Sequence, residues 1–223
     1  FHKIFAKVGV VYPEIEKESW IVDIGAAKLA TSPESFDVVV MENLYGDILS
    51  DVTAQMTGSV GLCGSANIGD KCAMFEAIHG SAPRRAGQNL ANPSGLLLGA
   101  VLMLAHINQA AIATKVHNAW LKTLEDGVHT YDIFRDGVSK EKVTTTEFAK
   151  AVIARLGQIP ATLKPAHYND FVVKMEPHYD YRNITKAKKE LVGVDVFLHW
   201  TDGTAEELGN KLKDIAVEGL KLS

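Results

Sequence analysis

The chain has 223 residues, of which 47% are hydrophobic and 22% are charged, a composition typical of a soluble globular protein with one large domain or two small ones. A formal net charge of −4 argues against nucleic acid or a charged membrane surface as a partner. The longest apolar stretch, residues 96–105, contains a glycine and is too short to cross a bilayer. We therefore expect neither a nucleic-acid partner nor a membrane partner.

The two cysteines, Cys63 and Cys72, lack the C-x-x-C spacing and the matching histidine pair of a zinc site. A disulfide framework is not expected from this pattern either. We expect both to be reduced residues in or near the core of a cytoplasmic protein.

Residues 1–8 are amphipathic with helical spacing, so the chain begins inside a helix and without an initiator methionine. Residues 219–223 have the character of a strand that stops as it begins. We therefore expect a fragment of a longer protein. Residues 20–24 predict a short strand or turn before a helix of small residues, with Asp23 as its N-cap, and residues 31–34 predict a turn and a further cap.

An apolar run at residues 36–41 predicts a buried strand, and residues 47–56 predict a helix directly after it. Asp47 and Asp51 are four residues apart, so their carboxylates share one face of that helix. They are either a solvated helix start with Asp47 as the cap, which the spacing alone favours, or two ligands for a hard divalent cation.

Residues 58–69 are a glycine-rich connection without the G-x-G-x-x-G or P-loop pattern of common nucleotide sites, so we expect a crossover between domains. Residues 72–78 then predict a buried strand, and residues 79–87 predict a loop that leaves it. Within the loop, Arg84 and Arg85 are either a solvated pair or two charged forks for a phosphate.

A long apolar helix is predicted at residues 96–114, and a second, amphipathic helix at residues 115–126, with Gly127 as its C-terminal stop. Both helices are expected to have a structural role only. After them, Tyr131 and Arg135 are spaced to form a surface contact between an aromatic ring and a cation.

Residues 144–147 predict the cap of a helix that continues to residue 156 and covers the core with Phe148, Val152 and Ile153. Residues 158–170 contain two prolines and mixed polarity, which is typical of a linker.

Beyond the linker, the pattern predicts a strand at residues 191–198 and an amphipathic helix at residues 204–217, capped by Thr204 and Glu207. Three lysines before the strand are expected to form a solvated edge: Lys186, Lys188 and Lys189. No chemistry is expected in this part of the chain.

The sequence Asn-Leu-Tyr-Gly-Asp-Ile-Leu-Ser-Asp at residues 43–51 resembles the N-x-x-G-D-x-x-S-D signature of the metal-dependent β-decarboxylating dehydrogenases, the isocitrate and isopropylmalate dehydrogenase family. The resemblance covers at least residues 21–156. It implies part of the α/β two-domain fold of that family, with a small additional C-terminal α/β domain. Residues 1–57 would be part of the small domain, which carries the dimer interface and the metal site, and residues 58–157 would be the C-terminal half of the large cofactor-binding domain. Residues 158–170 would be a linker, and residues 171–223 a truncated extra domain.

The resemblance also implies a metal site. Asp47 would bind Mg²⁺ or Mn²⁺, and Asp51 would lie in or beside its shell. Asp23 would reach across a two-fold dimer interface to the metal of the partner subunit, so Asp23 and Asp47 are the implied catalytic residues. Many members have glutamines or a His-Gln pair where this chain has Ala27 and Lys28, so a cofactor contact from the partner is not expected there.

The loop at residues 79–83 resembles the adenosine-binding loop of the family, and Asn92 matches its downstream asparagine. Basic residues after the loop proline imply NADP rather than NAD, because they would bind the 2′-phosphate. The implied cofactor-binding residues are Glu76, His79, Gly80, Ser81, Ala82, Arg84, Arg85, Asn92, Tyr131 and Arg135.

The implied function is oxidative decarboxylation of isocitrate with reduction of NADP, by a homodimer with shared sites that resembles the long bacterial form of the enzyme. Isopropylmalate or homoisocitrate dehydrogenase is an alternative, because the substrate-reading residues of the family would precede Phe1. A non-catalytic regulatory subunit is an alternative of another class, and the retained site residues argue against it. The 223-residue chain alone is expected to be inactive.

Overall fold

The computed structural model describes residues 1–69, 71–169, 188, 190–192, 197–213 and 215. The chain divides into two compact units, Phe1–Val173 and Lys174–Ser223, and each is treated by itself. No helix in the described part of the chain is both long and apolar enough to span a membrane.

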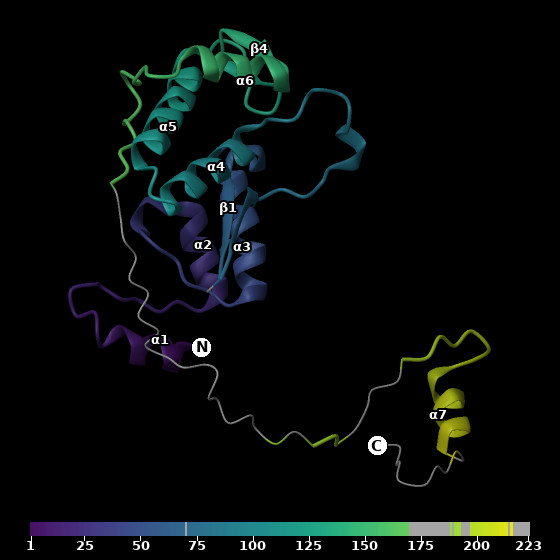
Figure 1. Cartoon of the computed structure of the whole chain (residues 1–223). Coiled ribbons are helices and arrows are strands. Elements are labelled where there is room, and N and C mark those ends of the chain that lie inside the picture. Colours follow the sequence, from purple (N-terminus) through teal and green to yellow (C-terminus); the bar gives the residue numbers. More distant parts are fainter. Residues whose placement is uncertain (70, 170–187, 189, 193–196, 214, 216–223) are drawn as a thin grey trace. The chain divides into compact units, whose positions relative to one another are not determined.

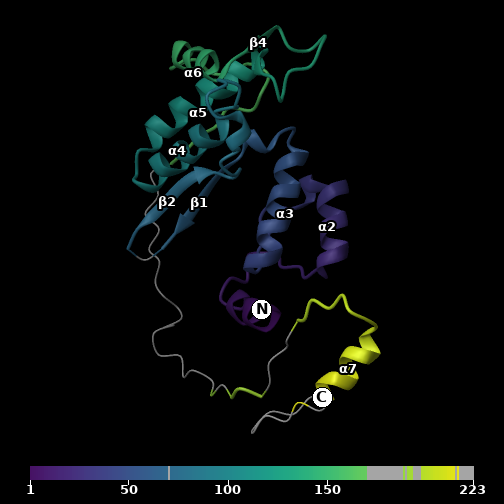
Figure 2. The same ribbon diagram turned by 90° about the vertical axis from the view of Figure 1, so that its right-hand side faces the viewer.

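The first unit opens with three helices, α1 (His2–Gly9), α2 (Val22–Thr31) and α3 (Asn43–Met56), with a 3-10 turn at Pro33–Ser35. The predicted helix at residues 1–8 is confirmed. Helix α2 lies beside α3 (Figure 2), and both helices bury a leucine.

Three predictions for this region are wrong. Asp23 is not the N-cap of α2, since Ile21 holds that position. Helix α3 begins at Asn43 rather than at Asp47, which therefore lies in its second turn. Residues 36–41 do not form a buried strand, and Val38 is 81% exposed. A strand needs a neighbour for its N–H and C=O groups, and none of the described strands pairs with this segment.

A hairpin follows, in which β1 (Gly64–Ile68) pairs antiparallel with β2 (Ala73–Ala77), with Gly64 opposite Ala77 and Ile68 opposite Ala73. The predicted strand at residues 72–78 is thus confirmed as a strand, but it is not buried as predicted, since Met74 is 53% exposed. The preceding connection was predicted as a loop, but it contains a 3-10 turn and β1. The sequence of β1, Gly-Ser-Ala-Asn-Ile, has few strand-forming residues, so its pairing with β2 had no local signal. Cys72 is exposed rather than near the core.

Helix α4 (Ser94–His106) lies against the hairpin (Figure 1). A Cβ atom built on Gly64 would lie 2.5 Å from the backbone nitrogen of Gly99 in α4, so a strand and a helix touch here through their main chains. This close approach requires glycine at position 64, and a Cβ atom on Gly99 would lie 2.9 Å from the Glu76 carbonyl oxygen of β2, so glycine is required there as well.

The two helices predicted at residues 96–126 exist, but the break between them was misplaced. Helix α4 ends at His106, and α5 (Ala110–Glu125) begins after a short turn. Asn108 in that turn has φ 59°, a left-handed conformation that asparagine tolerates and that stops a helix. Gly127, with φ 78°, ends α5 as predicted.

A parallel pair, β3 (Val128–Thr130) and β4 (Glu141–Val143), and helix α6 (Thr145–Ala154) complete the unit. The capping box of Thr144 and Glu147 is confirmed. The core here consists of Ala119, Trp120, Val128, Val143, Phe148 and Val152. Ile153 was predicted to join it but is 65% exposed, because it lies on another face of α6 from Phe148 and Val152.

In the second unit, α7 (Ala205–Lys213) is capped by Thr204 and Glu207 as predicted, with a 2.8 Å hydrogen bond from the Thr204 N–H to Glu207 Oε2. The predicted strand at residues 191–198 lies partly outside the described residues, as do Lys186 and Lys189, whereas Lys188 is exposed.

Candidate functional site

Helix α3 presents the two carboxylates that the sequence predicted as metal ligands. Asp47 and Asp51 lie one turn apart and both are exposed. Neither carboxylate has a hydrogen-bond partner among the described residues, so both are free to accept a cation; the neighbouring Ser50 hydroxyl donates instead to the Asp47 carbonyl oxygen at 3.0 Å. Two carboxylates are the hard oxygen ligands that suit Mg²⁺ or Mn²⁺.

Asp23 lies in the first turn of α2, where its Oδ1 accepts a hydrogen bond from the Ile24 N–H at 2.7 Å. Across the part of the chain that the structure describes, no group of three or more His, Cys, Asp or Glu side chains could hold a metal ion. Asp47 and Asp51 could therefore supply two ligands to a metal ion, and the remaining ligands would have to come from other groups.

The predicted adenosine-binding residues 79–83 lie in a long connection between β2 and α4, residues 78–93, which is called the loop from here on (Figure 1). His79 and both arginines are exposed, and His79 Nδ1 lies 2.8 Å from the Gly80 carbonyl oxygen. A 3-10 turn at Pro83–Arg85 follows Ala82, which has φ 42°. The loop thus carries its two guanidinium groups on a short, exposed 3-10 turn.

One contact joins this loop to the second predicted cofactor segment, which follows β3. The Arg85 guanidinium lies over the Tyr131 ring, with its central carbon 4.8 Å from the ring centroid. Arg135 is exposed in the same segment, and its backbone N–H donates to Ser139 Oγ at 2.8 Å. Within the described residues, Arg84, Arg85 and Arg135 form no ion pair, so their charges are available to an anion.

The far end of the loop is fixed by the start of α6. The backbone N–H of Thr145 donates to the Asn89 carbonyl oxygen at 3.0 Å, and its hydroxyl donates to the Ala91 carbonyl oxygen at 2.5 Å. The Asn89 side chain accepts two further hydrogen bonds from Thr146. The helix cap and the loop therefore support each other.

Asn92 is buried at the end of the loop, only 6% exposed, and its amide donates to Asp132 Oδ2 at 3.0 Å. Asp132 was not identified from the sequence. Its only signal was its place in Thr-Tyr-Asp, directly after Tyr131, and a lone aspartate in a turn is not distinctive.

Glu76 lies on β2, away from the turn that carries the arginines, and its Oε1 accepts from the Asn67 amide across the hairpin at 3.1 Å. The structure thus brings Arg85 into contact with Tyr131, and Asn92 into contact with Asp132. Glu76 and the predicted metal ligands Asp23, Asp47 and Asp51 have no contact with these residues among those the structure describes. The roles predicted for these residues stay predictions.

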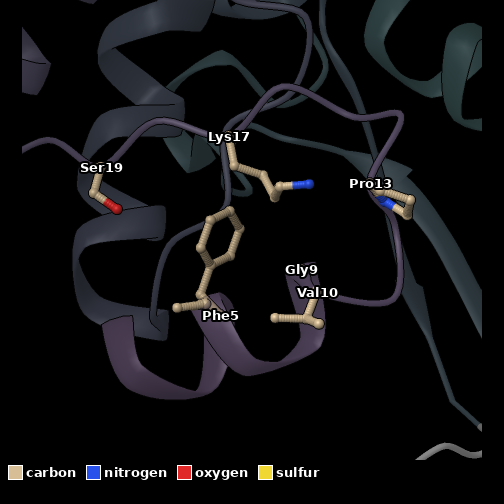
Figure 3. Close-up of a pocket in the computed structure, with 7 residues that line it drawn as sticks. Phe5, Gly9, Val10, Pro13, Lys17 and Ser19 are labelled. Carbon is tan, nitrogen blue, oxygen red and sulfur yellow. The ribbon is translucent and has the colours of Figure 1, made fainter.

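The two cavities near the N-terminus are separate from the predicted residues. One, of about 410 Å³, is bounded by α1 and the following turn and lined by Phe5, Val10, Pro13 and Lys17 (Figure 3). The other, of about 1120 Å³, is bounded by α1, α2, α3 and residues 35–42. No predicted metal or cofactor residue lines either cavity.

Comparison with known protein families shows to which family the chain belongs. The family model for isocitrate/isopropylmalate dehydrogenase matches residues 1–152. The chain belongs to this family. A second model, the C-terminal domain of bacterial isocitrate dehydrogenase, matches residues 189–223. The family and the fold class predicted from the signature at residues 43–51 are thereby confirmed.

Relatives of the dehydrogenase family cover the whole chain. Isocitrate dehydrogenase [NADP] of Rickettsia prowazekii is 52% identical over 100% of this chain and 48% of the relative. The protein of the same name from Thermus thermophilus is 42% identical over 96% of this chain and 42% of the relative. The chain spans about half the length of the curated relatives it matches.

Two solved structures are similar to this chain in both fold and sequence. The TT0538 protein from Thermus thermophilus has a TM-score of 0.69 and 43% identity, over 76% of this chain and 34% of that one. Isocitrate dehydrogenase from Methylococcus capsulatus has a TM-score of 0.66 and 38% identity, over 70% of this chain and 45% of that one.

Proposed function

We propose that this chain is part of an NADP-dependent isocitrate dehydrogenase that converts isocitrate to 2-oxoglutarate with a metal ion. The observation that carries the proposal is the 52% identity along the whole chain to relatives named isocitrate dehydrogenase [NADP]. The contact between Arg85 and Tyr131 supports it, since it gathers two predicted NADP-binding segments.

In this proposal, Asp47 and Asp51 bind the metal ion through exposed carboxylates that have no other partner among the described residues. When bound, the metal supplies a Lewis acid that stabilises negative charge on substrate oxygens, and NADP accepts the hydride. Because both ligands project from one rigid helix, α3 fixes their spacing before the substrate arrives.

The basic residues bind the 2′-phosphate of NADP. Arg84 and Arg85 come from the loop and Arg135 from the segment after β3, and the Tyr131 ring supports the Arg85 guanidinium. Each charge-assisted hydrogen bond to the phosphate contributes about 1.5–3 kcal/mol. NAD lacks this phosphate, so the three positive charges favour NADP.

Isopropylmalate and homoisocitrate are the competing substrates. A 3-isopropylmalate dehydrogenase from Methanothermobacter thermautotrophicus is 47% identical over 60% of this chain. The match of residues 189–223 to a bacterial isocitrate dehydrogenase domain favours isocitrate. A regulatory subunit without activity is disfavoured by the unpaired carboxylates of Asp47 and Asp51.

We further propose a two-fold homodimer in the cytoplasm. Helix α3 supports the dimer, because its apolar residues Leu44, Ile48 and Val52 are 64%, 51% and 45% exposed. Asp23 of one subunit would then complete the metal site of the other. The cytoplasmic location is proposed from the sequence, in which Cys63 and Cys72 do not have the pattern of a disulfide framework.

The test uses the full-length enzyme that contains this chain. With Mn²⁺ and NADP, the wild type is expected to form NADPH with isocitrate and not with isopropylmalate or homoisocitrate. Asp47→Asn should abolish this turnover and weaken Mn²⁺ binding measured by calorimetry. Asp136→Asn is the matched control, because Asp136 is an exposed carboxylate in a turn outside α3. Full activity of Asp47→Asn, or turnover of another substrate instead of isocitrate, would contradict the proposal.

A further inference from the structure

The Asp132 carboxylate accepts hydrogen bonds from three side chains, two of them distant in the sequence (Ser59 and Asn92) and one two residues away (Thr130). Its Oδ2 accepts from Ser59 Oγ at 2.5 Å and from Asn92 Nδ2 at 3.0 Å, and its Oδ1 accepts from Thr130 Oγ1 at 2.6 Å. The three donors are almost completely buried, at 9%, 6% and 0% exposure. Because buried donors need partners, these bonds fix the donors in place.

Each donor belongs to a different part of the candidate site. Ser59 follows the C-terminal end of the metal-bearing helix α3. Asn92 ends the adenosine-binding loop, and Thr130 ends β3. Asp132 itself follows Tyr131, whose ring contacts Arg85 of the loop. A single carboxylate therefore joins the turn that follows α3, the end of the loop and the segment that carries Tyr131 and Arg135.

Asp132 also fixes which way the Asn92 amide faces. Asn92 Oδ1 accepts from the Ser94 N–H at 3.0 Å, and Asn92 Nδ2 donates to Asp132. A flipped amide would place its oxygen against the carboxylate and its NH₂ against the Ser94 N–H. In the observed orientation, the second N–H of the Asn92 amide has no partner in the described chain.

We propose that Asp132 is a positioning residue for the adenosine end of NADP. It contacts no substrate in this role. It holds the Asn92 amide in its donating orientation and holds the Tyr131 segment in register with the loop. The inference rests on the proposed function, because it concerns the NADP-binding site of that enzyme.

Two substitutions separate the hydrogen bonds from the charge. Asp132→Ala removes all three acceptors. Asp132→Asn keeps one oxygen for Ser59 and Asn92, and its NH₂ group can donate to the Thr130 hydroxyl, which rotates to accept. The alanine variant should therefore lose the positioning, and the asparagine variant should recover most of it.

The experiment measures NADP binding to the full-length enzyme by calorimetry, together with the KM values for NADP and isocitrate. Asp132→Ala should raise the Kd and KM for NADP about tenfold to a hundredfold, with the KM for isocitrate nearly unchanged. Asp132→Asn should remain within about threefold of the wild type. The matched control is Asp136→Ala, which removes an exposed carboxylate from the next turn of the chain and should change nothing.

A second measurement asks whether Asp132 acts through Asn92. In an Asn92→Ala background, Asp132→Ala should raise the Kd for NADP much less than it does in the wild type. If Asp132→Ala does not fold, Asp132→Glu replaces it. That variant keeps the charge, moves the carboxylate by one methylene, and should raise the Kd about fivefold.

A wild-type Kd for NADP in Asp132→Ala or, where it is used, Asp132→Glu would overturn the inference. So would equal losses in the affinities for NADP, isocitrate and metal, which would indicate a general structural role. A wild-type enzyme that does not bind NADP would instead refute the proposed function, so the two failures are distinguishable.

Discussion

The contact between Gly64 and α4 allows a quantitative test of how the hairpin is held. An alanine at Gly64 would place its Cβ 2.5 Å from the Gly99 nitrogen, 2.8 Å from the Leu98 carbonyl carbon and 3.0 Å from the Gly95 carbonyl oxygen. All three neighbours are helix backbone, which cannot rotate away as a side chain can. The helix and the strand must therefore move apart, and overpacking of this kind costs about 1–3 kcal/mol.

This cost should appear in thermal unfolding of the full-length enzyme. Each kcal/mol lowers the midpoint by about 2–4 °C in a chain of 150–250 residues and by roughly half that in a chain twice as long, so Gly64→Ala should lower the midpoint of the full-length enzyme by roughly 1–6 °C. The matched control is Gly80→Ala, because no atom lies within 4 Å of the added Cβ there. Its free energy of unfolding should stay within about 0.5 kcal/mol of the wild type. A Gly64→Ala midpoint equal to that of the control would refute the reasoning.

Three further predictions concern the cofactor, the assembly and pH. Replacing Arg84 by Asp and Arg135 by Ser should raise the KM for NADP at least about a hundredfold relative to that for NAD, and a native preference for NAD in steady-state kinetics would contradict this. Mixing inactive Asp23→Asn and Asp47→Asn subunits should restore about one quarter of wild-type activity, because half of randomly paired dimers are mixed and each has one intact site; no recovery with mixed dimers confirmed by mass would count against shared sites. Burial lowers the pKa of His117 below its ordinary value of 6.5, so the unfolded chain binds more protons in this range and stability should fall as the pH drops below about 6.5. His117→Gln should flatten that dependence in denaturation experiments from pH 5 to 8, and an unchanged slope would show that other groups cause it.

His117, in α5, contacts a segment at residues 158–168, here called the strap, whose binding to that helix the sequence did not predict. Residues 158–168 have no regular secondary structure, as expected of a linker, yet they are bonded along α5. Asn118 exchanges two 2.9 Å hydrogen bonds with the backbone of Ala166, and His117 Nδ1 lies 2.9 Å from the Tyr168 hydroxyl. Protonation of His117 would place a positive charge in this half-buried contact.

Glu125 holds the other end of the strap. Its carboxylate accepts from the backbone N–H groups of Ala161, Thr162 and Leu163 and from the Thr162 hydroxyl. These bonds, led by that of Ala161 and helped by Lys122, keep the pKa of Glu125 far below its usual range. Composition predicts that such a segment is irregular, but not whether its backbone groups bond to water or to a helix.

Local patterns predicted what local physics determines. The caps at Thr144 and Thr204 and the stop at Gly127 depend on residues within one turn of each other, so the sequence was sufficient. The misplaced break near Asn108 depends on a single left-handed residue inside an apolar run. The absent strand at residues 36–41 and the unexpected strand β1 depend on pairing, which no short window contains.

The same distinction between local and long-range information applies to the residues of the candidate site. Its charged residues could be identified because the motif at residues 43–51 and the adjacent arginines of the loop are contiguous in the sequence. Asp132 could not, since its partners Ser59 and Asn92 are 73 and 40 residues away. A hydrogen-bond network between distant segments leaves no pattern in either segment alone.

The two kinds of aspartate have opposite electrostatic environments, which supports different roles for them. Asp47 and Asp51 are exposed and have no hydrogen-bond partner among the described residues, so binding a cation breaks no existing bond. Asp132 already accepts three hydrogen bonds from buried donors, and a ligand could engage it only by displacing them. Because an unpaired buried donor costs about 1–3 kcal/mol, such displacement is unfavourable, and Asp132 is suited to hold other residues rather than to bind a ligand itself.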